Sequence, residues 1–154
     1  MPTNIEIKAR AAHWDAQYRK AAKLTPLRKD LIQEDIFFHC PSGRLKLRTL
    51  GDGSAYLVFY RRPDTAEAKV SEYEMAPIAE PGSMRQLLAF ALGESCRLSK
   101  RRTVFHYGQT RIHFDDVEGL GRFIELEVVL RAGQTQIQGQ AIVQELMARL
   151  DIQK

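Results

Sequence analysis

The sequence has 154 residues, a length that suits one domain with a sizeable core and is too short for two full-sized domains. Hydrophobic residues make up 44% and charged residues 27%, and no apolar run reaches the roughly 18 residues of a membrane span, which argues against a membrane protein. The first residues lack the pattern of a secretory signal, so we expect a cytoplasmic location. The net charge of +4 indicates an anionic partner but does not separate nucleic acid from a nucleotide or polyphosphate.

Segments that alternate apolar and polar residues are mixed with helix-like segments. In chain order, the pattern predicts a strand at 4–10, a helix at 12–24, strands at 34–40, 44–50, 55–61 and 70–76, a helix from a Ser83 cap to Gly93, strands at 99–107, 110–116 and 123–130, and a helix that carries Ile142 to Leu150. Eight short strands joined by tight turns favour antiparallel pairing and are enough to close around a small ligand. We therefore predict an α+β fold in one domain spanning 1–154: an antiparallel, eight-stranded closed β-barrel (a tunnel) with a charged interior and about three flanking helices.

Charged side chains share one face of several predicted strands, because successive side chains of a strand point to opposite faces. These same-face groups are Glu6, Lys8 and Arg10; Arg44, Lys46 and Arg48; Lys100 and Arg102; Arg111, His113 and Asp115; and Glu125 and Glu127. A solvated sheet face is the ordinary explanation for such alternation. These positions, however, hold almost only Arg, Lys, Glu and Asp, sorted by sign between strands, and like charges side by side repel. The face therefore calls for a ligand that neutralises it.

A triphosphate with a hard divalent cation would neutralise both the strands rich in Arg and Lys and the strands rich in Glu and Asp. Arginine and lysine bind phosphate oxygens, and carboxylates bind Mg²⁺ or Mn²⁺. Such an ion would also withdraw charge from a phosphorus atom under attack. The charged faces therefore predict metal-assisted chemistry at a triphosphate.

An ordered set of motifs resembles the CYTH domain (triphosphate tunnel metalloenzyme) family. Asn4-Ile5-Glu6-Ile7-Lys8 resembles the Glu-x-Glu-x-Lys signature that opens these domains, although Asn4 stands where the first carboxylate belongs. The similarity continues through 41–48, 60–64, 69–73 and 100–102, and it is strongest over 109–115 and 119–127. It covers nearly the whole chain and points to a bacterial subgroup labelled class IV adenylyl cyclase-like. The family also includes thiamine triphosphatases.

The resemblance implies a role for each matching residue. Glu6, Glu125 and Glu127 would hold Mg²⁺ or Mn²⁺, Asp115 would lie near the reacting phosphate or a second metal ion, and Lys8 would assist the nucleophile. The implied phosphate-binding set consists of Lys8, Arg44, Lys46, Arg48, Arg62, Lys69, Lys100, Arg102 and Arg111. We interpret His113 as a hydrogen-bonding residue, with proton transfer as the alternative.

Three classes of function stay open. In an enzyme, water would release phosphate from tripolyphosphate, ATP or thiamine triphosphate, or the ribose 3′-oxygen of ATP would attack the α-phosphorus to give cyclic AMP and pyrophosphate. No residue stands out for the base pocket that cyclisation requires. The second class is a non-catalytic polyphosphate- or nucleotide-binding module, which the neutral Asn4 keeps open. Nucleic-acid binding ranks last, because the interleaved carboxylates would repel a phosphate backbone.

The C-terminal end differs from the subgroup. Its members often continue past the last helix into a short segment with a Ser-Tyr pair, whereas this sequence ends at Asp151-Ile152-Gln153-Lys154. If that segment covers the tunnel mouth, we expect a more open mouth here, or closure by a second subunit in a homodimer.

Overall fold

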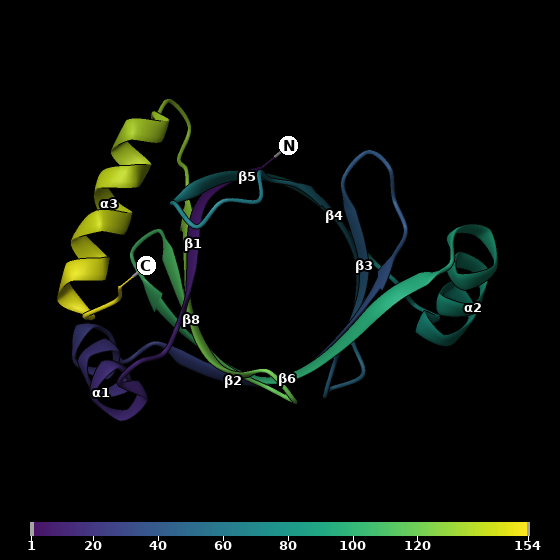
Figure 1. The fold of residues 1–154 in the computed structure, drawn as a ribbon, viewed down its shortest axis with the longest axis horizontal. Coiled ribbons are helices and arrows are strands. Elements are labelled where there is room, and N and C mark those ends of the chain that lie inside the picture. Colours follow the sequence, from purple (N-terminus) through teal and green to yellow (C-terminus); the bar gives the residue numbers. More distant parts are fainter. Residues whose placement is uncertain (1, 154) are drawn as a thin grey trace.

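A closed barrel forms the centre of the computed structural model, which describes residues 2–153 (Figure 1). The strands are β1 (Thr3–Arg10), β2 (Arg28–Phe38), β3 (Arg44–Leu50), β4 (Ala55–Arg61), β5 (Lys69–Pro77), β6 (Glu94–Tyr107), β7 (Thr110–Val117) and β8 (Gly121–Val129). They pair antiparallel in the order β1-β5-β4-β3-β2-β6-β7-β8, and β8 closes on β1. Within the described residues the helices are α1 (Trp14–Leu24), α2 (Pro81–Leu92) and α3 (Gln136–Arg149). The predicted α+β barrel with about three helices is confirmed.

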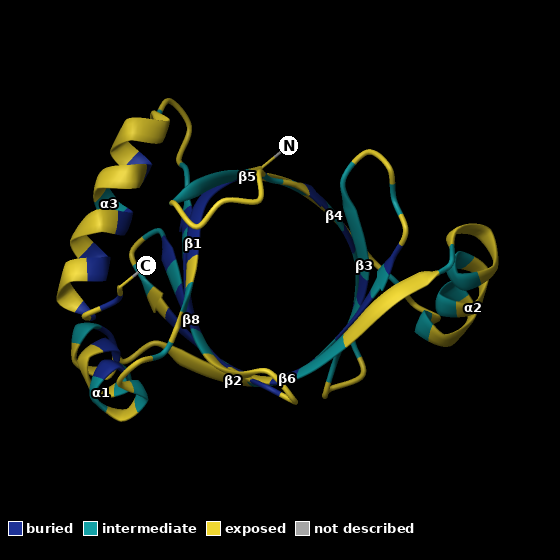
Figure 2. Cartoon of the chain, viewed as in Figure 1, coloured by how far each residue is buried: buried dark blue, intermediate teal, exposed yellow. Residues whose placement is uncertain are grey.

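The main apolar core lies outside the barrel, between its wall and two helices. Ile5 and Ile7 of β1 and Ile112 and Phe114 of β7 point outward and are almost fully buried. Helices α1 and α3 cover this side (Figure 1). Their buried residues, such as Val143 of α3, face the barrel, and the outer face of each helix is exposed (Figure 2). Because the outer side chains form the core, the inner side chains are available for polar groups.

A smaller core lies on the opposite side of the barrel, under α2. Ile36 of β2 and Leu47 of β3 are buried there, and Met84 and Leu88 of α2 pack on them. All residues of α2 are described, and none of them is buried. No helix within residues 2–153 is long and apolar enough to cross a membrane.

Local sequence signals explain how α3 docks and where α2 begins. The side chain of Thr135 accepts a hydrogen bond from the backbone N–H of Gln138, and the backbone N–H of Thr135 donates one to the side-chain oxygen of Gln138. This capping box starts α3. A side chain at Gly139 would meet Ile5 Cγ1 at 2.6 Å, so glycine is needed for α3 to approach β1. The predicted Ser83 cap of α2 is wrong. The helix begins at Pro81, whose fixed φ and missing N–H suit a first turn.

Two strands are longer at their N-terminal ends than predicted. β2 begins at Arg28 and β6 begins at Glu94, and the two strands form one long ladder that runs from Arg28 opposite Phe105 to Phe38 opposite Glu94. The added residues are mostly polar and exposed, so they show no apolar alternation. The added residues of β2 pair with the predicted part of β6, and those of β6 pair with the predicted part of β2. The pattern of a single segment cannot reveal such pairing.

Candidate functional site

The barrel encloses a cavity of about 230 Å³ whose lining comes from all eight strands. Eight of the lining residues are Arg or Lys and four are Asp or Glu, so the cavity carries a surplus of positive charge. In the order of the strands, β3 and β8 are separated by four steps in both directions, and they therefore lie on opposite sides of the lumen. The glutamates of β8 and the cations of β3 therefore face each other across the lumen.

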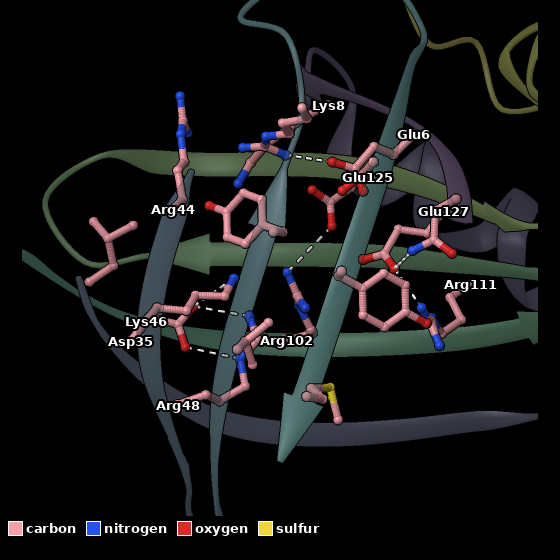
Figure 3. A pocket seen from close by; sticks show the side chains of 18 of the residues that line it. Glu6, Lys8, Asp35, Arg44, Lys46, Arg48, Arg102, Arg111, Glu125 and Glu127 are labelled. Carbon is pink, nitrogen blue, oxygen red and sulfur yellow. Dashed lines mark hydrogen bonds and ion pairs between the residues drawn. The ribbon is translucent and has the colours of Figure 1, made fainter. Parts of the chain in front are cut away.

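One side, which we call the acidic wall, consists of Glu6 of β1 and Glu125 and Glu127 of β8. Glu6 lies directly opposite Glu127 in the β1–β8 pair, and Lys8 lies opposite Glu125. Figure 3 shows the three carboxylates gathered on one side of the cavity. The three residues predicted to bind metal are thus neighbours on two adjacent strands.

His113 of β7 completes a compact group with two of these carboxylates. Its Nδ1 lies 2.9 Å from Oε1 of Glu125 and 3.3 Å from Oε1 of Glu127. One ligand atom from each of these three residues lies within 4.8 Å of the others, so together they could hold a metal ion. Glu6 is not in this group, and its Oε1 accepts a hydrogen bond from Nη1 of Arg62 at 2.6 Å. The hydrogen-bonding role predicted for His113 agrees with these contacts.

The surroundings shift the pKa values of Glu6 and Glu125 in opposite directions. Burial raises the pKa of Glu6, the charge of Glu125 raises it further, and the hydrogen bond from Arg62 offsets this only in part. Burial also acts to raise the pKa of Glu125, but the contacts with His113 and the charge of Arg102 outweigh it and hold that pKa well below its usual range. Glu125 is therefore more firmly ionised than Glu6.

Asn4 takes part in the acidic wall despite its neutral side chain. Its Nδ2 donates to Oε2 of Glu127 at 3.3 Å, and Nη2 of Arg111 donates to the same oxygen at 2.7 Å. Oδ1 of Asn4 is buried and has no hydrogen-bond partner among the described residues. The amide thus orients Glu127 and leaves one acceptor atom unsatisfied beside the cavity.

The opposite side, the basic wall, consists of Lys46 and Arg48 of β3 with Asp35 of β2 (Figure 3). Asp35 is 1% exposed and accepts from Nε and Nη2 of Arg48 at 2.9 and 3.0 Å. Nζ of Lys46 lies 3.6 Å from the same carboxylate. Burial acts to raise the pKa of Asp35, but Arg48 and Lys46 outweigh it and lower that pKa. A single ionised carboxylate therefore balances two cations.

Two lysines of the lining have pKa values close to neutral pH. Burial lowers the pKa of Lys46 to about 7, and the positive charge of Arg48 contributes to the shift. Burial and the charge of Arg102 lower the pKa of Lys100 to about 8. An anion in the cavity would stabilise the charged form of both amines.

Asp115 lies beneath the lining and is not among the described residues that line the cavity. It is 0% exposed and accepts from Nε and Nη2 of Arg102 at 2.7 and 2.8 Å, while Nζ of Lys100 lies 3.5 Å away. Asp115 contacts the cations and keeps them oriented toward the lumen. Its carboxylate is thus set back from the cavity lining, in contact with Arg102.

Eight of the nine predicted phosphate-binding residues line the cavity, and Lys69 is the exception. Nζ of Lys69 donates to the backbone oxygen of Thr65 at 2.8 Å. Sequence reasoning missed Asp35 and Tyr60, whose ring lies under the charged groups of Lys46 and Arg62. Alternation within the predicted strand 34–40 would have placed Asp35 inside. It is the only Asp, Glu, Lys or Arg on that face of the strand, however, so no repeated pattern of charges indicated it.

Solved structures share this fold at low sequence identity. The PH1012 protein of Pyrococcus horikoshii OT3 is 21% identical, with a TM-score of 0.87 over 98% of this chain and 92% of that chain. A candidate adenylate cyclase from Vibrio parahaemolyticus is 18% identical, with a TM-score of 0.71 over 96% of this chain and 88% of that chain. The Pct1 RNA triphosphatase of Schizosaccharomyces pombe is 13% identical, with a TM-score of 0.51 over 98% and 82%.

These similarities are too weak in sequence to show more than the fold, and no curated protein matches the sequence. The family model described as the CYTH domain matches residues 2–154. Because that match spans nearly the whole sequence and the chain has the closed eight-stranded tunnel, the protein belongs to the CYTH domain family.

Proposed function

We propose that this protein is a divalent-metal-dependent enzyme that acts on a triphosphate-bearing substrate inside its barrel. The observation that carries the proposal is the pair of oppositely charged walls that face each other across one cavity. A triphosphate would neutralise the surplus cations, and a metal ion would neutralise the carboxylates. Two structural neighbours bear the names adenylate cyclase and RNA triphosphatase, and both names denote reactions at a triphosphate.

The residues of the acidic wall fit a divalent ion. Glu125, Glu127 and His113 would hold it, and Glu6 would join them once Arg62 moves to a phosphate. Carboxylate oxygens with one imidazole suit Mn²⁺ and also accept Mg²⁺. When bound, such an ion supplies positive charge that stabilises the phosphoryl oxygens during reaction.

The basic wall and its neighbours would bind and orient the phosphate chain. Arg48 and Arg102 present guanidinium groups whose geometry matches phosphate oxygens, and each is held by a buried carboxylate, Asp35 or Asp115. Those two carboxylates would act as positioning residues. Lys8 lines the cavity opposite Glu125, so it is our candidate for the base that accepts a proton from the nucleophile.

Assays of the purified protein with Mn²⁺ or Mg²⁺ would test this proposal. The substrates are tripolyphosphate, ATP and thiamine triphosphate, and the products to follow are phosphate, pyrophosphate and cyclic AMP. We expect metal-dependent turnover that Glu125→Gln abolishes, while the control Glu145→Gln on the exposed face of α3 retains it. Ligand binding without any product would favour a binding module, the second candidate, for which the neutral Asn4 beside Glu127 is the supporting observation.

A further inference from the structure

Helix α2 differs from the other two helices in the side chains that it exposes. Among its 12 residues only Arg85 is charged, and Nε of Arg85 donates to Oε1 of Glu94 at 2.8 Å. The exposed faces of α1 and α3 carry charged and amide side chains, such as Lys20 and Gln144. A helix in contact with water ordinarily has such a polar face, whereas a helix that is mostly apolar all round is ordinarily buried. The outward face of α2 therefore has the composition of a covered surface.

Two large apolar side chains of α2 are open to solvent. Phe90 is 84% exposed and Leu87 is 63% exposed, whereas Met84 and Leu88 of the same helix pack against the smaller core. Leu87 and Phe90 are three residues apart, so they are neighbours on one face of the helix. This face lies at the edge of the molecule, on the side away from α1 and α3 (Figures 1 and 2). No larger exposed fraction is found for any large apolar side chain within residues 2–153.

A hollow of about 310 Å³ lies next to these side chains. Segment 77–80, which connects β5 to α2, forms one side of the hollow, and Ser83, Met84 and Leu87 of α2 form the other. Of the described residues that line it, only Glu80 is charged. Because an apolar cavity of about 150 Å³ is enough to hold a benzene molecule, this hollow can accept the ring of a phenylalanine. The same surface thus carries a protruding ring and a space that fits a ring.

A two-fold axis through Leu87 would bring the ring of one copy to the hollow of another. In two antiparallel helices related by such an axis, residue 90 of one copy lies opposite residue 84 of the other. Phe90 is about 4.5 Å beyond Leu87 along the helix, and Met84 is about 4.5 Å before it. The ring of each copy therefore reaches the hollow of the other, and both contacts form together. No charge of α2 loses its partner, because Glu94 already pairs with Arg85.

The area of α2 indicates how strong such a contact would be. A helix of 12 residues is about 18 Å long and about 12 Å across, so its outward half offers about 340 Å². A standard protein interface takes about 800 Å² from each partner. The area therefore suits a weak dimer that forms at high concentration.

We propose that α2 is a self-association surface, through which two copies of this chain form a weak, two-fold symmetric dimer with Phe90 of each copy in the hollow of the other. Helix α2 packs on the outward residues Ile36 of β2 and Leu47 of β3. The contact therefore leaves the lining of the cavity unchanged. The dimer is independent of any reaction inside the barrel.

Sedimentation equilibrium of the purified full chain, from about 5 µM to about 500 µM, tests the dimer. We expect a dissociation constant on the order of 100 µM, and we expect Phe90→Gln to weaken association at least tenfold. Urea unfolding should show no loss of stability in this variant, because the side chain of Phe90 is exposed in the single copy. Ile137→Gln is the matched control, since Ile137 of α3 is 78% exposed, and it should associate like the unchanged protein.

Disulfide formation tests the position of the axis. In a Cys40→Ser/Cys96→Ser background, Leu87→Cys should give an intermolecular disulfide on oxidation, because the two copies of residue 87 face each other. Ile137→Cys should not. Dimerisation of the Leu87→Cys protein without this disulfide would overturn the antiparallel arrangement.

Three other results would overturn the self-association surface. One is a protein that stays monomeric over the whole concentration range, and another is a dimer that Phe90→Gln leaves unchanged. The third is binding to phosphatidylcholine vesicles that Phe90→Gln abolishes, which would assign this face of α2 to a lipid surface instead.

Discussion

The acidic wall and the basic wall face the same cavity, but their charges are balanced in different ways. On the acidic wall, arginines from other elements already occupy carboxylates: Arg62 binds one and Arg111 binds another. On the basic wall, Asp35 alone balances Lys46 and Arg48. The difference indicates that binding of the two proposed ligands, a metal ion and a phosphate chain, would be coupled. A metal ion that took the carboxylates would release the arginines, which could then bind phosphate.

Removing a carboxylate from the acidic wall should have the largest effect. Glu125→Gln keeps the shape of the side chain but removes the charge that a divalent ion requires, so we expect turnover to fall about a thousandfold. Calorimetric titration with Mn²⁺ should show a parallel loss of metal affinity. Normal Mn²⁺ binding in this variant would contradict the assignment of Glu125 as a ligand.

Removing the carboxylate of the basic wall should chiefly lower the stability of the protein. Asp35→Asn leaves the partly buried cations Lys46 and Arg48 without a counter-charge, so the free energy of unfolding should fall by about 3 kcal/mol. Urea unfolding measures this loss. Tripolyphosphate should stabilise the variant more than the unchanged protein, because the ligand supplies the missing negative charge.

Glu34→Gln is the matched control for Asp35→Asn, because Glu34 is on the outer face of the same strand and pairs with Arg97 at the surface. It should change the free energy of unfolding by less than about 1 kcal/mol. A similar loss for both variants would show that the inward position of Asp35 has no special importance.

The affinity for a triphosphate should depend on pH through the lysines of the lining. Lys46, with a pKa of about 7, and Lys100, with a pKa of about 8, are charged below these values and lose their charge as the pH rises through them. The affinity for tripolyphosphate should therefore fall by about tenfold between pH 6.5 and 9 relative to a chain in which these positions do not titrate. Lys46→Arg/Lys100→Arg provides that reference. Identical pH profiles for the two proteins would refute the role of the lysines.

Adding a carboxylate to the acidic wall should have the smallest effect. Asn4→Asp places a charge next to Glu127, so Mn²⁺ should bind about fivefold more tightly. Ser71→Asp on β5 is the control, because Ser71 lies directly opposite Asn4 and also lines the cavity. An equal gain in both variants would mean that charge alone matters and that position 4 is not a ligand position.

Much of the site could be predicted from the sequence, because side chains alternate along a strand. The runs around Lys46 and around Glu125 already carried charges on every second residue, and these charges do point into the lumen. The order of strands in the closed barrel depends on contacts between distant segments, so the opposition of β3 and β8 could not be predicted. For the same reason, the pairing that places Asp115 beneath Arg102 became visible only in the structure.

The contacts that a polar or charged side chain makes also could not be predicted from the sequence. Lys69 matched a motif, but the backbone of Thr65 binds its amine. The sequence predicts a hydrogen-bonding role for His113, but only the structure shows that two carboxylates approach the same ring nitrogen. Motif matching identifies which residues face inward, whereas distances decide which of them act together.

The position of the core outside the barrel has a consequence for how this protein can change. In β1, Ile5 and Ile7 support the helices while Glu6, between them, faces the lumen. Outward-facing positions of a strand therefore stabilise the fold, and the inward-facing positions between them set the chemistry of the cavity almost independently. During evolution, the inward-facing residues could be replaced one at a time to bind another anion, while the outward-facing residues preserve the shape of the barrel. An engineer could do the same by randomising every second residue of β3, β6 and β8.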